Sequence, residues 1–188
     1  ISTIELEDGI EYASMQKKAI HSAMAGGVMI LTGGPGTGKT TVIRALLRIF
    51  DSLGMDTALA APTGRAAKKM SQATQREAKT IHRLLEMEYS GEDEPAFRRD
   101  ADNLLDEDAL IIDEASMIDI SLMASLMRAV KPGARLILIG DADQLPSVGA
   151  GNVLRDVIAS ERFHTVKLNH VFRQADESLI ITNAHAIN

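Results

Sequence analysis

The sequence predicts an α/β fold, a doubly wound and mainly parallel sheet with helices on both faces. Short apolar runs that end in glycine, proline or an acid alternate with segments whose apolar residues recur at helical spacing. Right-handed crossovers between parallel strands then place helices on both faces of the sheet. The chain has 188 residues, 45% of them hydrophobic, which is enough for one domain with its own core.

The five expected strands are short runs rich in Val, Ile, Leu and Ala, as is typical of parallel strands buried on both faces. They cover residues 27–33, 56–62, 109–114, 134–141 and 164–172. The first is followed by "TTVIRALLRIFDSLG", which has a helical apolar pattern and stops at Gly54. After the second strand, Thr63 is expected to cap the next helix.

Further helices are expected between the later strands. "TQRE" at 74–77 has the spacing of a capping box, and "TIHRLLEME" at 80–88 is expected to continue as a short helix. Segment 118–130 carries apolar residues four apart, which indicates a helix facing the core. The segments "GNVLRDVIA" and "ESLIITNAHAI" have the same character.

Residues 87–106 interrupt the alternation, because they are polar and acidic and contain a glycine and a proline. Two interpretations are open, a plain surface loop and a small insertion such as a hairpin. Loop-length statistics favour the loop.

Charge is distributed unevenly along the chain, whose net charge is −6. Residues 86–108 contain ten acids and two arginines, whereas residues 63–83 contain six Lys or Arg and one Glu. We call 63–83 the basic stripe. It is either a surface that follows nucleic-acid phosphates or a solvated helix face.

Several classes of protein are disfavoured by composition. The chain has no cysteine, which excludes disulfides, thiolate metal sites and cysteine nucleophiles and favours a cytoplasmic location. No apolar run approaches the length of a membrane span, so we expect no membrane association. The first residue is not Met and the last residues continue a helical pattern, so we expect a fragment of a longer chain, treated as one domain over 1–188.

A glycine-rich segment between the first strand and its helix matches the pattern G-x-x-x-x-G-K-[ST], a P-loop. Its backbone N–H groups and the helix N-terminus can surround phosphate oxygens, Lys39 can reach the β- and γ-phosphates, and the Thr40 hydroxyl can bind Mg²⁺. The expected nucleotide-binding residues here are Gly33, Gly34, Pro35, Gly36, Thr37, Gly38, Lys39, Thr40 and Thr41. The pattern therefore predicts a site for ATP and Mg²⁺.

Two acids end the third strand in "ALIIDE". The carboxyl ends of parallel strands border the crevice where such sheets bind ligands. We therefore expect Asp113 to bind Mg²⁺, directly or through water, and Glu114 to orient and deprotonate the attacking water.

Six segments occur in the order "GGPGTGKTT", "APTGRAA", "TIHRLL", "IIDEASM", "GDADQLPSVGAGNVL" and "VFRQ". Together they resemble the first RecA-like motor domain of superfamily 1 DNA helicases of the RecD-like and TraA-type group, over nearly all of residues 10–188. The resemblance implies a RecA-like P-loop NTPase that couples ATP hydrolysis to 5′ to 3′ movement on single-stranded DNA and to unwinding. It places the strand ending at Gly140 between the P-loop strand and the "IIDE" strand. The implied partners are single-stranded DNA, a second RecA-like domain of the same chain and possible nuclease or helicase subunits.

The resemblance also implies roles for single residues. Gln16 corresponds to the glutamine that binds the adenine edge, Gln144 to a γ-phosphate sensor, and Arg173 to an arginine that stabilises the transferring phosphoryl group. Phe172 either stacks on the adenine or belongs to the core.

Two further segments correspond to parts of the family that touch DNA. Thr63, Gly64 and Arg65 open a helix and can meet a DNA phosphate. His82 either contacts DNA or is a structural histidine. The small pin domain of the family would fall at 87–106.

Two other functions compete with the helicase. One is a P-loop ATPase of the AAA+ type, although the fourth strand ends in "LIGDADQLPSVG", which favours the helicase. The other is a non-catalytic nucleotide-binding interaction module, against which the intact Lys39, Asp113 and Glu114 argue. The chain by itself is expected to hydrolyse ATP slowly, because a helicase site of this kind is completed by a second domain.

Overall fold

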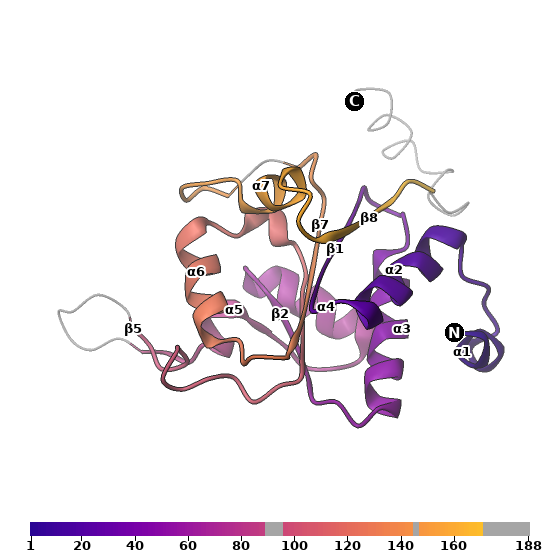
Figure 1. Ribbon diagram of the computed structural model, residues 1–188, viewed down its shortest axis with the longest axis horizontal. Coiled ribbons are helices and arrows are strands. Elements are labelled where there is room, and N and C mark those ends of the chain that lie inside the picture. The colour runs from indigo at the N-terminus through magenta and orange to yellow at the C-terminus, as the bar shows by residue number, and fades with distance from the viewer. Residues whose placement is uncertain (89–95, 145–146, 171–188) are drawn as a thin grey trace.

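The computed structural model describes residues 1–88, 96–144 and 147–170. A six-stranded sheet forms the centre of the domain, and its strands pair in the order β3-β2-β6-β7-β1-β8 (Figure 1). Every pairing in it is parallel. The strands are β1 (Val28–Gly33), β2 (Thr57–Ala61), β3 (Ala78–Thr80), β6 (Ala109–Ile112), β7 (Arg135–Gly140) and β8 (His164–Leu168). The predicted parallel sheet is confirmed, and β7 lies between β6 and β1 as expected.

Helices cover both faces of this sheet, which confirms the doubly wound prediction (Figure 1). They are α1 (Ser2–Asp8), α2 (Ser14–Ala25), α3 (Lys39–Ser52), α4 (Gly64–Thr74), α5 (Ile81–Leu84), α6 (Ile120–Ala129) and α7 (Val153–Ala159), with a 3₁₀ turn η1 (Ala115–Met117). Within the residues described, none of these helices has the length and apolar character needed to cross a membrane.

The central strands β1, β6 and β7 have no polar face, because alternate residues pack into two separate cores. In β7, Ile137 and Ile139 pack with residues of α2, α3 and α4 on one side. Leu136 and Leu138 pack with residues of α5, α6 and α7 on the other. The continuous apolar runs in the sequence reflect this burial on both faces.

The prediction of a capping box at 74–77 was wrong. Helix α4 ends at Thr74, whose hydroxyl donates a hydrogen bond to the carbonyl of Met70 (2.8 Å). Gln75 takes a left-handed conformation with φ of 57°, which redirects the chain. The next residues form β3 against β2, because pairing with an open sheet edge outweighs a weak local capping pattern.

The helix expected over 80–88 is much shorter in the structure. Thr80 caps α5, its hydroxyl accepting a hydrogen bond from the backbone N–H of Arg83 (3.2 Å). The helix stops at Leu84, and Glu86 has a positive φ of 54°. The chain then enters β4 (Met87–Glu88).

The acidic segment contains a small antiparallel pair of strands, β4 and β5 (Ala96–Phe97), separate from the main sheet. The structure therefore favours the hairpin-like insertion over the plain loop that loop-length statistics preferred. The residues between the two strands lie outside the described part of the chain.

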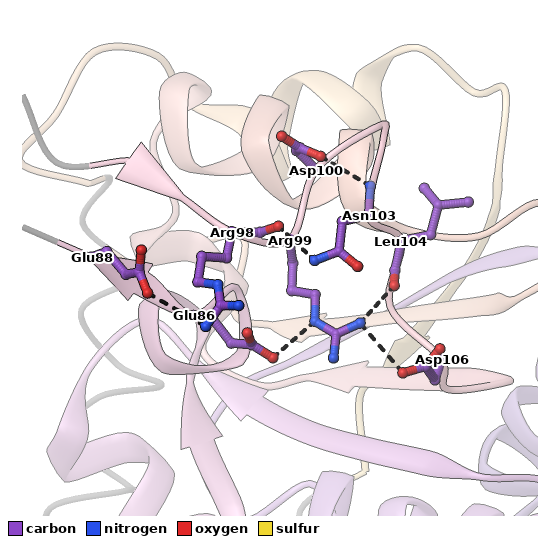
Figure 2. A network of polar contacts seen from close by, with 8 residues as sticks. All are labelled: Glu86, Glu88, Arg98, Arg99, Asp100, Asn103, Leu104 and Asp106. Atoms are coloured by element: carbon purple, nitrogen blue, oxygen red, sulfur yellow. Dashed lines mark hydrogen bonds and ion pairs between the residues drawn. The ribbon is translucent and has the colours of Figure 1, made fainter.

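Polar contacts tie the end of this insertion to the domain (Figure 2). The guanidinium of Arg99 donates to Glu86 Oε1 (2.8 Å), to the carbonyl of Leu104 (2.8 Å) and to Asp106 Oδ2 (3.3 Å). The side-chain amide of Asn103 donates to the carbonyl of Arg98 (2.8 Å). A planar guanidinium with several donors is suited to such a branched contact. Part of the acidic charge is thus used to fix the base of β4 and β5.

Candidate nucleotide-binding site

The P-loop leads from the carboxyl end of β1 into α3. Gly36 and Gly38 have φ values of 74° and 88°, a conformation that glycine adopts without strain. Gly38 caps α3, so the backbone N–H groups of the first helical turn face the loop. A Cβ atom at Gly33 would lie 2.7 Å from the carbonyl oxygen of Leu168, which excludes a side chain there. The glycines thus allow a close backbone cradle of the kind that binds phosphate.

Lys39 folds back over this loop. Its Nζ donates hydrogen bonds to the carbonyl oxygens of Gly33 (2.6 Å) and Gly34 (2.8 Å). Burial lowers the pKa of Lys39, while the nearby carboxylates of Asp141, Asp113 and Glu114 oppose this shift. The ammonium is therefore held at the cradle by neutral acceptors and surrounded by acidic groups.

Asp113 and Glu114 follow directly after β6, at the carboxyl end of the sheet. The backbone N–H of Glu114 donates to Asp113 Oδ1 (2.9 Å), and Glu114 itself has a positive φ of 52°. Such a conformation is strained for a residue with a side chain and is typical of functional sites. Burial raises the pKa of Asp113, against the opposing effects of the Glu114 N–H and of Lys39 and Lys69.

The raised pKa of Asp113 predicts a stability effect. The pKa of Asp113 in the folded state lies above its value in the unfolded state. The parent chain therefore gains stability as the pH falls through the range between these two pKa values, whereas Asp113→Asn, which has no carboxyl at this position, does not. The variant should therefore be more stable than the parent at neutral pH, and this advantage should shrink towards a pH of about 4. Urea unfolding at both pH values measures it, with exposed Asp102→Asn as the control. An advantage that grows on acidification would contradict the assignment.

These groups line one cavity of about 590 Å³. Its lining residues come from the P-loop and α3, from α4, and from the segments after β6 and β7: Pro35, Gly36, Thr37, Gly38, Lys39, Thr40, Thr41, Ile43, Lys69, Met70, Ala73, Thr74, Asp113, Glu114, Asp141 and Gln144. The structure therefore brings together the predicted P-loop side chains, both acids and Gln144. A hydroxyl at Thr40 and a carboxylate at Asp113 are hard oxygen donors, the ligands that Mg²⁺ prefers.

Gln16 lies beside the P-loop, in the first turn of α2. Its side chain is almost fully buried, with 2% exposed. Oε1 accepts a hydrogen bond from the backbone N–H of Ala13 (2.9 Å), and Nε2 donates to the carbonyl of Gly38 (3.4 Å). The residue is thus not an ordinary exposed glutamine of a helix surface, and it links α2 to the phosphate loop.

The predicted DNA-contacting residues lie away from this cavity. Thr63 caps α4 as expected, its hydroxyl accepting from the N–H of Ala66 (3.2 Å), and Arg65 in the first turn is exposed. His82 is half-buried, and its ring lies 5.9 Å from that of Phe97 with a tilt of 44°. This contact favours the alternative in which His82 has a packing role, whether or not it also contacts DNA. Phe172 and Arg173 lie outside the described residues.

The cations of the basic stripe have different partners. Arg76 forms an ion pair with Asp51 of α3, and Lys69 lines the cavity. Arg65 and Lys68 are exposed on α4. The charge count along the sequence therefore combines residues with different surroundings.

Comparison with known proteins places the chain in a family. A model of the AAA domain family matches residues 11–188. The chain belongs to this family. The family description alone does not separate a helicase from other ATPases, and the relatives supply that distinction.

Two curated relatives of this AAA domain are RecD proteins, and one of them is named as a DNA helicase. The ATP-dependent RecD2 DNA helicase of Deinococcus radiodurans is 44% identical over 160 residues, covering 85% of this chain and 21% of that protein. The RecBCD enzyme subunit RecD of Mycobacterium tuberculosis is 43% identical over 166 residues, covering 76% of this chain and 28% of that subunit. The resemblance to a RecD-like superfamily 1 motor domain is confirmed. The chain spans less than a third of the length of either relative.

Solved structures confirm the RecA-like fold of the AAA domain. Pif1 helicase from Candida albicans matches with a TM-score of 0.66 at 22% identity, over 95% of this chain and 44% of that one. Bacteroides sp Pif1 in complex with ADP-AlF4 matches with a TM-score of 0.62 at 23% identity, over 88% of this chain and 43% of that one. At such identities the likeness concerns the fold alone.

Sequence reasoning missed two charged residues of the AAA domain's cavity. Asp141 follows β7 as Asp113 follows β6, and it is 8% exposed. The rule that ligands bind at the carboxyl ends of parallel strands could have identified it. Lys69 had no such signal, because only the packing of α4 turns it towards the cavity.

Proposed function

We propose that this AAA domain is the ATP-binding motor domain of an ATP-dependent DNA helicase, which moves 5′ to 3′ on single-stranded DNA, unwinds duplexes and acts in the cytoplasm. The observation that carries the proposal is the convergence of Lys39, Asp113 and Glu114 on one cavity at the carboxyl end of the sheet. The name of one curated relative, the ATP-dependent RecD2 DNA helicase, supports the DNA substrate.

In the proposed mechanism, Lys39 exchanges its carbonyl partners for the β- and γ-phosphates of ATP, which are stronger charged acceptors. The Thr40 hydroxyl and the Asp113 carboxylate would hold Mg²⁺, which neutralises charge on the transferring phosphoryl group. Glu114 orients the attacking water and accepts its proton.

The remaining assignments extend the same site. Gln144 lines the cavity and would report on the γ-phosphate, while Gln16 beside Gly38 would bind the adenine edge. Arg173 would stabilise the transferring phosphoryl group, and Phe172 would stack on the base. The roles of these four residues rest on the resemblance, and the place of Gln144 in the cavity lining supports its role.

Single-stranded DNA would meet the N-terminus of α4. The first turn of α4 after Thr63 and Gly64 offers backbone N–H groups and the exposed guanidinium of Arg65, and His82 of α5 would belong to a second DNA-contacting segment. We further propose that a second RecA-like domain of the same chain closes over the nucleotide and that nuclease or helicase subunits associate with the whole protein. The small β4–β5 sheet would be the base of a pin domain.

Arg65→Ala tests the DNA assignment. It should weaken binding to single-stranded oligonucleotides of any sequence and reduce the slope of log affinity against log salt by about 0.7. Fluorescence anisotropy across a salt series measures both effects. Arg128→Ala, which removes an exposed arginine from α6, is the control and should leave the slope unchanged. Loss confined to one DNA sequence would argue against a phosphate contact.

The whole proposal is tested with a protein that carries this domain together with its natural continuation. ATP turnover should rise on addition of single-stranded DNA, and a forked duplex with a 5′ tail should be unwound in preference to one with a 3′ tail. ATP binding without any turnover, with or without DNA, would instead identify a non-catalytic nucleotide-binding module.

A further inference from the structure

Lys69 stands apart from the other cations of the basic stripe. It lies in α4 beside Met70, and both line the 590 Å³ cavity together with Ala73 and Thr74 of the same helix. Its neighbour Lys68 is also exposed but does not line the cavity. Two adjacent lysines of one helix therefore face different surroundings.

The cavity has an excess of negative charge. The carboxylates of Asp113, Glu114 and Asp141 line it, whereas its lysines are Lys39 and Lys69. The Nζ of Lys39 is engaged by the carbonyls of its own loop. Across residues 1–88, 96–144 and 147–170, the side chain of Lys69 makes no hydrogen bond or ion pair, so its ammonium is available to a ligand.

Electrostatic effects agree with this placement. The pKa of Lys39 is lowered mainly by burial, and the positive charge of Lys69 adds to that lowering. The pKa of Asp113 is raised by burial, and Lys69 partly opposes the rise. The charge of Lys69 therefore reaches both the phosphate-binding lysine and the carboxylate assigned to Mg²⁺.

We infer that Lys69 is a second cation of the nucleotide site, which attracts the polyphosphate tail from the α4 side of the cavity. This inference rests on the proposed binding of ATP. It separates Lys69 from the surface that the basic stripe would offer to nucleic-acid phosphates. Because α4 begins at the proposed DNA-binding segment, one helix of eleven residues would then contact both ligands.

Isothermal titration calorimetry with Mg·ATP tests the inference on the 188-residue chain, with Lys68→Ala as the matched control. Lys69→Ala should weaken ATP binding by about three- to tenfold, an effect that shrinks as salt is raised, while Lys69→Arg and Lys68→Ala stay close to the parent. The parent and these three variants should unfold at similar temperatures, because neither Lys68 nor Lys69 is buried.

Three results would overturn it. Equal ATP affinity for Lys69→Ala and the parent, while Lys39→Ala loses binding, would leave the nucleotide site intact and remove Lys69 from it. Equal loss of single-stranded DNA affinity for Lys69→Ala and Lys68→Ala, without a change in ATP affinity, would return Lys69 to the DNA surface. Unchanged ATP binding by Lys39→Ala would reject the nucleotide site itself, and the role of Lys69 with it.

Discussion

Replacing Glu114 by glutamine is expected to lower ATP turnover by about 10²–10⁴-fold, the usual contribution of a positioned general base. Glutamine keeps the size and hydrogen-bonding capacity of the side chain but cannot accept the proton of the attacking water. Nucleotide affinity should change little, because Lys39 and the P-loop backbone make the phosphate contacts. The measurement is DNA-stimulated phosphate release by the protein that carries this domain, alongside calorimetry of Mg·ATP binding.

The backbone at Glu114 needs its own control, because its φ of 52° is strained for any side chain. Glutamine has a similar backbone preference, so unfolding temperatures of the two proteins should agree closely. Glu11→Gln, at an exposed position outside the cavity, should leave turnover unchanged. Turnover by Glu114→Gln within a few-fold of the parent would assign the base to another residue.

Replacing Lys39 by alanine is expected to weaken ATP binding by about 10²–10³-fold. Each hydrogen bond between a charged donor and a phosphate contributes about 1.5–3 kcal/mol, and Lys39 is placed to make contacts with two phosphates. Calorimetric titration with Mg·ATP and Mg·ADP measures the loss. Binding of ATP should suffer more than binding of ADP, because only ATP has the γ-phosphate.

Lys18→Ala is the matched control for this loss of charge, since Lys18 is exposed on α2 and does not line the cavity. The fold should survive Lys39→Ala, because Lys39 lines the cavity and is not part of the packed core. If Lys39→Ala binds ATP as tightly as Lys18→Ala, then the P-loop assignment fails even though the motif is intact.

Much of the fold follows from local sequence patterns. The run "GVMILTG" became β1, "TTVIRALLRIFDSLG" became most of α3, and Thr63 capped α4, because these segments combine burial, propensity and capping signals that agree. The errors fell at 74–88, where such signals were weak. There, the pairing of β3 with β2 and the positive φ of Glu86 determined the path of the chain, and a capping pattern predicts neither of them.

The candidate site divides in the same way. The phosphate loop and the acids after β6 could be predicted, because the ends of strands and the starts of helices leave recognisable patterns in consecutive residues. Gln16 could be selected only by resemblance, since its contact with Gly38 joins residues 22 apart in the chain.

The sequence by itself determined the parallel sheet, the P-loop and the position of Asp113 and Glu114 at its carboxyl edge. Only the tertiary structure decided that Asp141 joins them and that Lys69, but not Lys68, lines the cavity. The reason is geometric. Consecutive residues of a helix point about 100° apart, so the rotation of α4 against α3 selects which lysine faces the nucleotide site. That rotation is set by the packing of Met70 into the core formed by distant strands and helices, and no local pattern encodes it.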